Sequence, residues 1–279
     1  MTNGAVIFAQ NNSAIDYVKI ATFSAKQVKR YLNIPVSLVT DSPEAVTEAD
    51  VFDQIIVINS PANSQTKLFN DGALASKQLV WKNYSRSQIF DLTPYDTTLV
   101  IDSDYIINSS ILSLAFESDS NFQIYRNSMD LAGWRNTSSF DRLNQYAIPF
   151  YWATTFVFRK DEITKSFFDL ISHIKENWNY YRLLYTIDTK AFRNDFAFSI
   201  AIHIMNNNTT GDFATPLPGT MVYVLDKDLL VDAVDNKMKF LVEKESYHGE
   251  YTLVKTTGLD VHVMNKSSLV RFIEGGHGV

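Results

Sequence analysis

The segment Leu99–Ile107 has the sequence LVIDSDYII, in which an apolar run ends abruptly at Asp102 and Asp104 and then resumes. An apolar run of this kind is typical of a buried strand in a mostly parallel sheet. The carboxyl end of such a strand is where an open α/β sheet presents ligand-binding groups. Two carboxylates one residue apart repel each other, so a divalent cation between them is one interpretation. A polar turn after the strand is the other, because Asp-Ser-Asp also suits turns.

The composition allows a large hydrophobic core and excludes cysteine chemistry. The 279 residues are 46% hydrophobic and 20% charged, which argues against disorder. The lack of Cys excludes disulfides, thiolate metal ligands and thiol nucleophiles. A net charge of −6 argues against an overall basic field for nucleic acid, although a local basic groove stays open. The leader Met1–Gly4 is too short for a signal peptide, and no apolar run approaches about 18 residues, so we expect a cytoplasmic protein with no membrane partner.

Alternating strand and helix patterns predict a doubly wound α/β sheet. Apolar, β-rich runs predict strands at residues 5–10, 36–40, 54–58, 98–101, 122–125, 153–158, 222–225 and 260–264. Apolar residues at helical spacing predict helices at residues 15–31, 76–90, 161–178, 194–205 and 267–273. The polar segments 59–71 and 126–146 are predicted to be loops. Because no linker or internal repeat interrupts the pattern, we expect a single domain over residues 1–279.

His262 is the candidate for a third metal ligand beside the two aspartates. It lies inside the predicted strand 260–264, which we expect to run beside the strand that ends at Asp102. Imidazole with two carboxylates is a set of hard and borderline ligands that suits Mn²⁺ better than an all-oxygen Mg²⁺ site. The alternative is a buried histidine that is hydrogen-bonded and binds no metal.

Three further charged residues are candidates for substrate contacts. Arg86 precedes the aspartates and Lys266 follows His262 by four residues, and either could neutralise a diphosphate held on the metal. Their alternative is an ordinary solvated surface charge. Asp195 begins the predicted helix 194–205, where the helix dipole favours an acid in any case, or it contacts a substrate hydroxyl.

The segment Arg86–Asp104 resembles, without a gap, the corresponding segment of glycosyltransferases of the GT-A fold, among them the glycogenin-like family 8 enzymes. That family has a basic residue on a helix, then a tyrosine, and then an Asp-X-Asp after a central strand. These positions hold Arg86, Tyr95, Asp102 and Asp104 here. The resemblance implies an α/β fold of the GT-A, Rossmann-like type, with a central mixed, mostly parallel sheet flanked by helices.

The same resemblance implies roles for individual residues. Asp102, Asp104 and His262 would bind Mn²⁺ or Mg²⁺, and Lys266 would stand near the family's phosphate-binding lysine. Arg86 would contact the donor's sugar or phosphate, and Asp195 would contact the donor sugar or the acceptor; these two are the predicted catalytic residues. The remaining predicted contacts to the nucleotide-sugar lie at strand ends and inside the motif, and are Ala9, Gln10, Asp41 and Ser103. Residues 1–108 would form the donor-nucleotide half and residues 109–279 the acceptor half.

These expectations describe a metal-dependent glycosyltransferase that moves a sugar from a nucleotide-sugar, most simply a UDP-sugar, to an acceptor hydroxyl. Residues 6–11 and 261–266 also look like predicted glycosyltransferases of large tailed phages, which adds a hydroxymethylated base of phage DNA, in the host cytoplasm, to protein and glycan hydroxyls as acceptors. A DNA acceptor predicts a basic groove around Arg126, Arg135 and Arg142.

Two other classes of protein stay open. A nucleotidyltransferase also pairs aspartates with a metal on an α/β sheet, but it would need a Gly-rich phosphate loop where this sequence has Gln10–Ser13. A non-catalytic nucleotide-sugar-binding module would keep the sheet and show no metal-dependent UDP binding.

Overall fold

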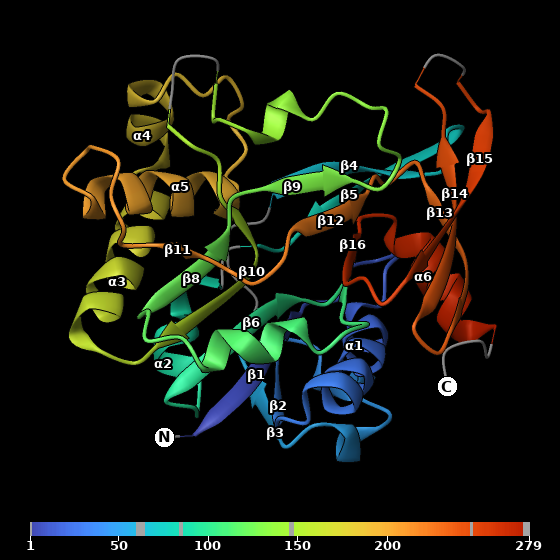
Figure 1. Ribbon diagram of the computed structural model, residues 1–279, viewed down its shortest axis with the longest axis horizontal. Helices are drawn as coiled ribbons and strands as arrows, with labels where there is room; N and C mark the ends of the chain where they lie inside the picture. The colour runs from blue at the N-terminus through green and yellow to red at the C-terminus, as the bar shows by residue number, and fades with distance from the viewer. Residues whose placement is uncertain (1, 60–64, 84–85, 145–147, 246–247, 276–279) are drawn as a thin grey trace.

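The computed structural model describes residues 2–59, 65–83, 86–144, 148–245 and 248–275. Its largest sheet has the strand order β11-β8-β10-β6-β1-β2-β3, and β6 lies at its centre (Figure 1). The strands of this sheet are β1 (Asn3–Ala9), β2 (Val36–Thr40), β3 (Gln54–Val57), β6 (Thr97–Asp102), β8 (Phe122–Tyr125), β10 (Trp152–Arg159) and β11 (Thr215–Pro216).

The central sheet is mixed and mostly parallel. β1 pairs in parallel with β2 and β6, and β2 with β3, whereas β10 runs antiparallel to both β6 and β8. Successive residues of β1 point to opposite faces of the sheet, and each face has its own hydrophobic core. Ile7 packs on one face with Val28, and Val6 packs on the other with Phe167. Burial of both faces explains why these strands read as unbroken apolar runs. The predicted fold class, a mostly parallel α/β sheet flanked by helices, is confirmed.

Helices cover the two faces of this sheet (Figure 1). α1 (Tyr17–Leu32) packs on β1 and β2, whereas α3 (Glu162–Glu176) and α5 (Asn194–Met205) pack together on the opposite side, with α5 against β10. The remaining helices are α2 (Ile89–Leu92), α4 (Trp178–Leu184) and α6 (Lys266–Glu274), with short 3-10 turns η1 (Pro43–Ala45), η2 (Ala49–Val51), η3 (Arg86–Gln88), η4 (Ile111–Phe116) and η5 (Ser138–Phe140). In the described part of the chain, no helix combines the length and apolar character needed to cross a membrane.

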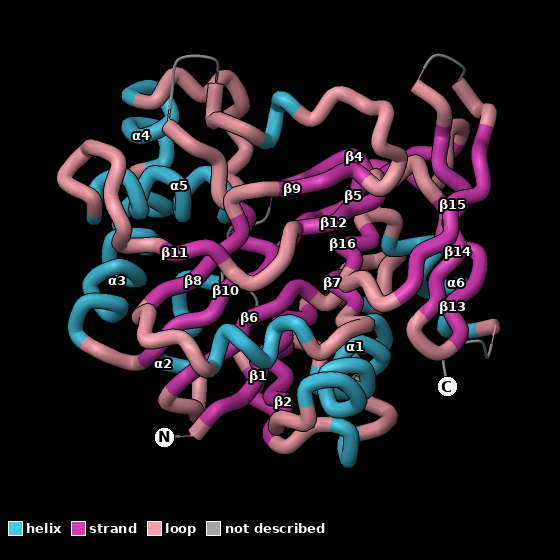
Figure 2. The backbone as a smooth tube through the Cα atoms, viewed as in Figure 1, coloured by secondary structure: helices cyan, strands magenta, loops and turns pink. Residues whose placement is uncertain are grey.

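A second sheet starts where β6 ends. Its order is β7-β16-β12-β9, with β7 (Tyr105–Ile106), β9 (Ser128–Asp130), β12 (Met221–Val224) and β16 (Val261–Val263). The chain therefore leaves the central sheet at Asp102 and joins the second sheet at Tyr105. A three-stranded antiparallel sheet, β13 (Leu229–Val234), β14 (Lys237–Glu243) and β15 (Tyr251–Thr257), lies next to α6 (Figure 2).

The chain between β3 and η3 differs from the prediction of a loop at 59–71 and a helix at 76–90. β4 (Gln65–Asp71) and β5 (Ala75–Trp81) form an antiparallel hairpin, while residues 60–64 and 84–85 lie outside the described residues. The physical reason is a period of two: Leu79 is buried and its neighbour Val80 is exposed, as on a strand with one covered face. The apolar residues that suggested a helix match helical spacing only by coincidence.

The segment 126–146 is also more ordered than the predicted loop. It contains β9, which pairs in parallel with β12, and the turn η5. Its last residues, 145–146, lie outside the part of the chain that the structure describes.

Candidate metal and nucleotide site

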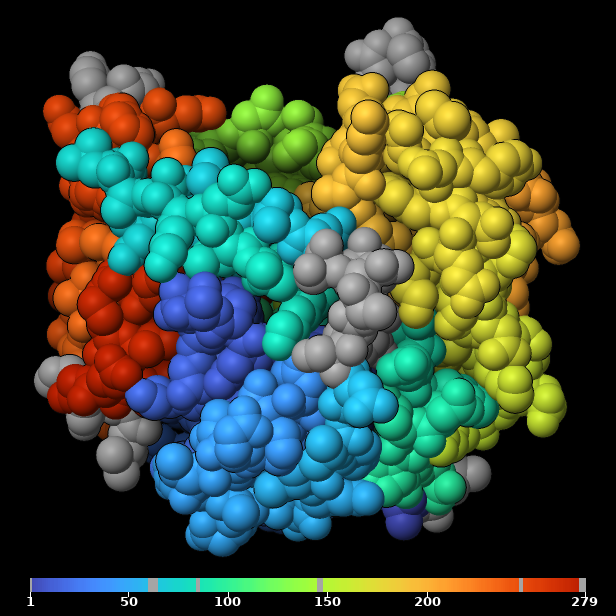
Figure 3. All heavy atoms as spheres, turned by 180° about the vertical axis from the view of Figure 1, so that it is seen from behind, coloured from blue at the N-terminus to red at the C-terminus, as the bar shows by residue number. Residues whose placement is uncertain are grey.

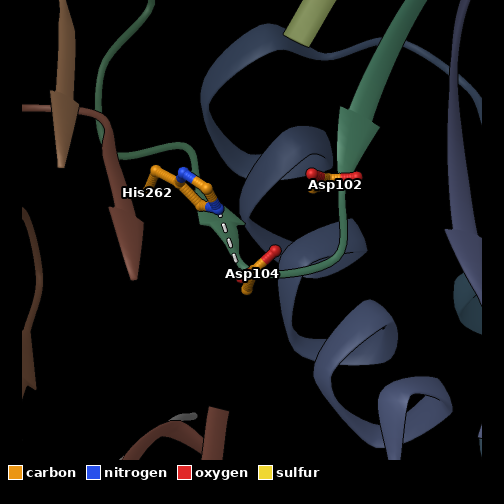
Figure 4. A group of neighbouring side chains, drawn as sticks. All are labelled: Asp102, Asp104 and His262. Atoms are coloured by element: carbon orange, nitrogen blue, oxygen red, sulfur yellow. Dashed lines mark ion pairs between the residues drawn. The ribbon is translucent and has the colours of Figure 1, made fainter. Parts of the chain in front are cut away.

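Three side chains, one from each of two sheets and one from the turn between them, meet where the central sheet ends (Figure 4). Asp102 is the last residue of β6, Asp104 follows in the turn to β7, and His262 is the middle residue of β16. One ligand atom from each lies within 4.8 Å of the others. The expectation that the strand of His262 runs beside β6 is wrong, because β16 pairs with β7 and β12 instead. The register places His262 opposite Tyr105, and this pairing brings its ring to Asp104.

Asp104 is buried between two potential cations. Its Oδ2 lies 2.5 Å from Nζ of Lys266 and 3.3 Å from Nε2 of His262. Burial alone would raise the pKa of Asp104, but the attraction of Lys266 and His262 outweighs it and lowers the pKa well below its usual range. Burial likewise acts to lower the pKa of Lys266, whereas Asp104 and Tyr17 raise it, and the net shift is upward. Both groups are therefore charged near neutral pH.

Arg86 holds the other aspartate. It forms an ion pair with Asp102 and donates a hydrogen bond to the carbonyl of Ala153. Burial lowers the pKa of Arg86 to about 10, against the attraction of Asp195 and Asp104, so the guanidinium stays charged at neutral pH. The cation predicted from the sequence to face the donor thus lies beside the first aspartate of the motif.

Asp195 joins the start of α5 to β10. Its Oδ1 accepts a hydrogen bond from the backbone N–H of Ala153 at 3.0 Å, and its Oδ2 lies 2.8 Å from Arg193. Because Ala153 also accepts from Arg86, the two predicted catalytic residues are held by one short piece of β10. Asp195 therefore has a fixed carboxylate that faces the same cavity as the aspartate motif.

The donor atoms at this point fit a divalent cation. Two carboxylates and one imidazole form a set of hard and borderline ligands that Mn²⁺ and Mg²⁺ accept. Nδ1 of His262 is buried and has no hydrogen-bond partner among the residues described, so only Nε2 of this ring faces the carboxylates. Arg86 and Lys266 balance the two aspartates in this structure. Asp102, Asp104 and His262 could thus hold a metal ion.

A cavity of about 230 Å³ opens beside these ligands. The predicted residues that line it are Gln10, Arg86, Asp102, Ser103, Asp104, Asp195, His262 and Lys266. Ala9 and Asp41 do not: Ala9 is buried, and the Asp41 carboxylate, 1% exposed, is paired with Lys82 at 2.8 Å. The volume is just under the roughly 300 Å³ at which pockets enclose a whole small ligand, so a nucleotide-sugar would extend beyond the cavity.

Sequence reasoning missed the part of the cavity wall that comes from the β4–β5 hairpin. Figure 3 shows this hairpin, in cyan, across the upper part of the rear face, between the C-terminal region and the region of α4. The missed lining residues include Lys67, Phe69, Trp81, Lys82 and Asn83 from the hairpin and its end, with Arg193, Asn194 and Asp226 from the second half of the chain. Phe69 and Leu79 are buried beside the exposed Leu68 and Val80, and because all four residues are apolar the sequence carried no clear alternation to signal the strands.

The prediction of a basic groove around Arg126, Arg135 and Arg142 is wrong for Arg135. Arg135 is buried in ion pairs with Asp130 at 2.5 Å and Asp228 at 2.7 Å, so it cannot contact a nucleic acid. Arg126 and Arg142 instead line a second cavity, together with residues from the C-terminal half of α5. No acidic residue lies among the described residues that line it.

No protein-family model matches the sequence, and no curated protein matches it either. Among solved structures, the glycosyltransferase GlyE of Streptococcus pneumoniae TIGR4 is similar, with 14% identity, a TM-score of 0.46 and coverage of 78% of this chain. The chain spans 45% of the length of that structure. The galactosyltransferase LgtC, solved with donor and acceptor sugar analogs, is similar over 77% of this chain and 73% of its own, with 13% identity and a TM-score of 0.46. A likeness this distant does not extend to an activity.

Proposed function

We propose that the protein is a metal-dependent glycosyltransferase that transfers a sugar from a nucleotide-sugar, most simply a UDP-sugar, to an acceptor hydroxyl. The observation that carries this proposal is the convergence of Asp102, Asp104 and His262, within 4.8 Å of one another, at the wall of a cavity. The same wall carries several lysines and arginines, which suit a ligand with a diphosphate.

The positions of these residues suggest a role for each of them in the proposed reaction. When bound, Mn²⁺ or Mg²⁺ supplies Lewis-acid stabilisation of the charge on the departing nucleoside diphosphate. Asp102, Asp104 and His262 hold the ion, while Arg86 and Lys266 add fixed positive charge for the same leaving group. Asp195, held by the Ala153 N–H, orients a hydroxyl of the donor or the acceptor.

The proposed donor half, residues 1–108, supplies both aspartates and Arg86, and the proposed acceptor half, residues 109–279, supplies His262, Lys266 and Asp195. For the acceptor we keep the hydroxymethylated base of phage DNA, with protein and glycan hydroxyls as alternatives. The second cavity, with Arg126 and Arg142, supports an anionic acceptor. A phage DNA acceptor would place the enzyme in the host cytoplasm.

A nucleotidyltransferase has less support, because the backbone at the start of α1 is already hydrogen-bonded. A Gly-rich phosphate loop uses free backbone N–H groups before a helix. Here the side-chain Oδ1 of Asn12 accepts from the backbone N–H groups of Ala14 and Ile15, and the side-chain Oδ1 of Asn11 accepts from Val18 N–H. These side chains occupy the donors that a phosphate would need.

The test is UDP release from a panel of UDP-sugars with Mn²⁺, with EDTA, and with or without hydroxymethylated DNA. We expect metal-dependent release that D104N and D102N each reduce by about 100-fold or more, since each replaces a charged carboxylate ligand with a neutral, weaker amide. D50N, which changes an exposed carboxylate far along the chain, is the control and keeps full activity.

D102N is the variant less prone to misfold, because the Asp102 side chain is 29% exposed whereas that of Asp104 is 4% exposed. It therefore tests the metal site even if D104N fails to fold. Unchanged turnover in folded D102N and D104N would refute the metal assignment. The absence of both turnover and metal-dependent UDP binding would point to the non-catalytic binding module.

A further inference from the structure

The β4–β5 hairpin places a lysine that no predicted role includes at the cavity wall. Lys67 and Phe69 lie on the same face of β4, because alternate residues of a strand point the same way. Phe69 is buried in a core with Leu79, which lies opposite Lys67 across the hairpin, and Lys67 continues this row into the cavity. Lys67 therefore comes to the site from an element separate from the aspartate motif.

The hairpin is attached to the rest of the molecule on both sides. Asn70 Nδ2 donates to Asp226 at 3.0 Å, and Arg271 pairs with Asp71 at 2.6 Å, which ties β4 to the C-terminal region. Asn12 Nδ2 donates to the carbonyl of Val80 at 3.1 Å, which ties β5 to the loop before α1. These contacts fix the strand that carries Lys67 relative to the cavity.

Charge pairing in the cavity leaves Lys67 as the exception. The other lysines and arginines of the cavity wall are each paired with a carboxylate, in the pairs Lys82–Asp41, Arg86–Asp102, Arg193–Asp195 and Lys266–Asp104. Lys67 has no carboxylate partner among the described residues, and its Nζ lies over the rings of Trp81 and Phe69, at 5.1 and 5.5 Å from their centroids. Its ammonium group therefore lies against two ring faces at the cavity wall, with no ion pair among the described residues.

The field around Lys67 is positive. The surrounding protein atoms, together with the charges of Lys266 and Arg193, lower the pKa of Lys67 to about 8, although the residue keeps contact with solvent. A cation held beside two other cations is stabilised by an anion that binds between them. Asp226 and Asp104 act in the opposite direction on Lys67, but each more weakly than either of the two cations.

We propose that Lys67 binds the diphosphate of the nucleotide in this cavity, as a contact contributed by the hairpin in addition to Arg86 and Lys266. This inference rests on the proposed function, because it takes the ligand to be a nucleoside diphosphate or its sugar ester. The anion is the diphosphate rather than a carboxylate on the sugar, since Lys67 shares the cavity with Lys266, whose partner Asp104 belongs to the metal-ligand set.

The test compares binding of UDP and of uridine, with Mn²⁺ present, to the wild type, K67M and K67R. Loss of one charge-assisted hydrogen bond predicts that K67M binds UDP about 10- to 100-fold more weakly. Uridine, which has no phosphate, should bind equally to both, and K67R should recover most of the UDP affinity. Met keeps the apolar stem against Trp81 and Phe69, so the hairpin stays folded. K77M, on the same hairpin but exposed and outside the cavity wall, is the matched control.

Three results would overturn the proposed role of Lys67, and a fourth would overturn the proposed function. Equal UDP affinity of K67M and wild type overturns the inference, and so does an equal loss for uridine, which would mean that Lys67 only supports the hairpin. A loss seen with UDP-glucuronate but absent with UDP-glucose overturns it in favour of a sugar carboxylate. If the wild type binds none of UDP, GDP and ADP with Mn²⁺, the proposed function itself fails.

Discussion

Arg135 shows that the role of a charged residue depends on its surroundings in the fold. Its guanidinium donates to both Asp130 and Asp228, and all three side chains are at most 8% exposed. Burial acts to lower the pKa of Arg135, but the two carboxylates outweigh it and raise the pKa, so the residue stays charged. Asp228 also accepts the backbone N–H groups of Leu225 and Glu243. The group joins β9, β13 and β14, and its role is structural.

Replacing Arg135 with Met should therefore destabilise the protein strongly. The substitution leaves two buried carboxylates close together with no cation, and breaking a buried ion pair from one side costs about 3–5 kcal/mol. We expect a matching fall in the free energy of unfolding, measured in urea. R126M, at an exposed position, should change it by less than about 0.5 kcal/mol. A loss in R135M as small as that in R126M would contradict the assignment of Arg135 to the buried group.

At the scale of single elements, α3 shows how local sequence defines a boundary. Its N-cap, Asp161, accepts a hydrogen bond from Thr164 N–H at 2.7 Å, and Asp161 N–H donates to Thr164 Oγ1 at 3.1 Å. These reciprocal bonds satisfy donors that the first turn of a helix leaves free. From that start, Phe167, Ile171 and Ile174 fall on one face and enter the core.

Removal of this cap should have a moderate cost. D161A loses the N-cap bond and should lower the free energy of unfolding by about 1 kcal/mol, measured by urea denaturation. D161N, which keeps an acceptor, should lose much less. D169A removes only the exposed pair with Lys165 on the same helix, and we expect a change of about 0.5 kcal/mol or less. An equal effect of D161A and D169A would show that the cap contributes nothing beyond surface charge.

On the scale of the whole molecule, the cavity draws its walls from both halves of the chain. Phe8, Gln10 and the aspartate motif come from the first half, and Asp195 and His262 from the second. A ligand bound there contacts segments that are far apart in sequence, and it binds only when they are assembled. Ligand binding should therefore stabilise the folded state as a whole.

Mn²⁺ with UDP, each at about 100 times its dissociation constant, should raise the melting temperature by on the order of 5 °C, because binding at that ratio adds about 2.7 kcal/mol. EDTA should reverse the part that depends on the metal. The measurement is a thermal melt of the wild type and of D104N, in which Mn²⁺ should give no shift. An equal shift in D104N would place the metal elsewhere on the protein.

The amino-acid sequence by itself determined the central strands, the main helices and the aspartate pair of the candidate metal site. Unbroken apolar runs mark strands buried on both faces, as at residues 99–101, and the helical period marks α1, α3 and α5, because both patterns are local. The motif formed by Asp102 and Asp104 is likewise local, because it spans only three residues.

Only the tertiary structure decided how these parts meet. The pairing of β16 with β7, which brings His262 to Asp104, depends on strand register between segments about 157 positions apart, and no local pattern specifies it. The same holds for the β4–β5 hairpin with Lys67 and for the burial of Arg135 between Asp130 and Asp228. A short segment with ambiguous periodicity takes its form from the surface that it covers, and a charged residue takes its role from the charges that the fold places around it.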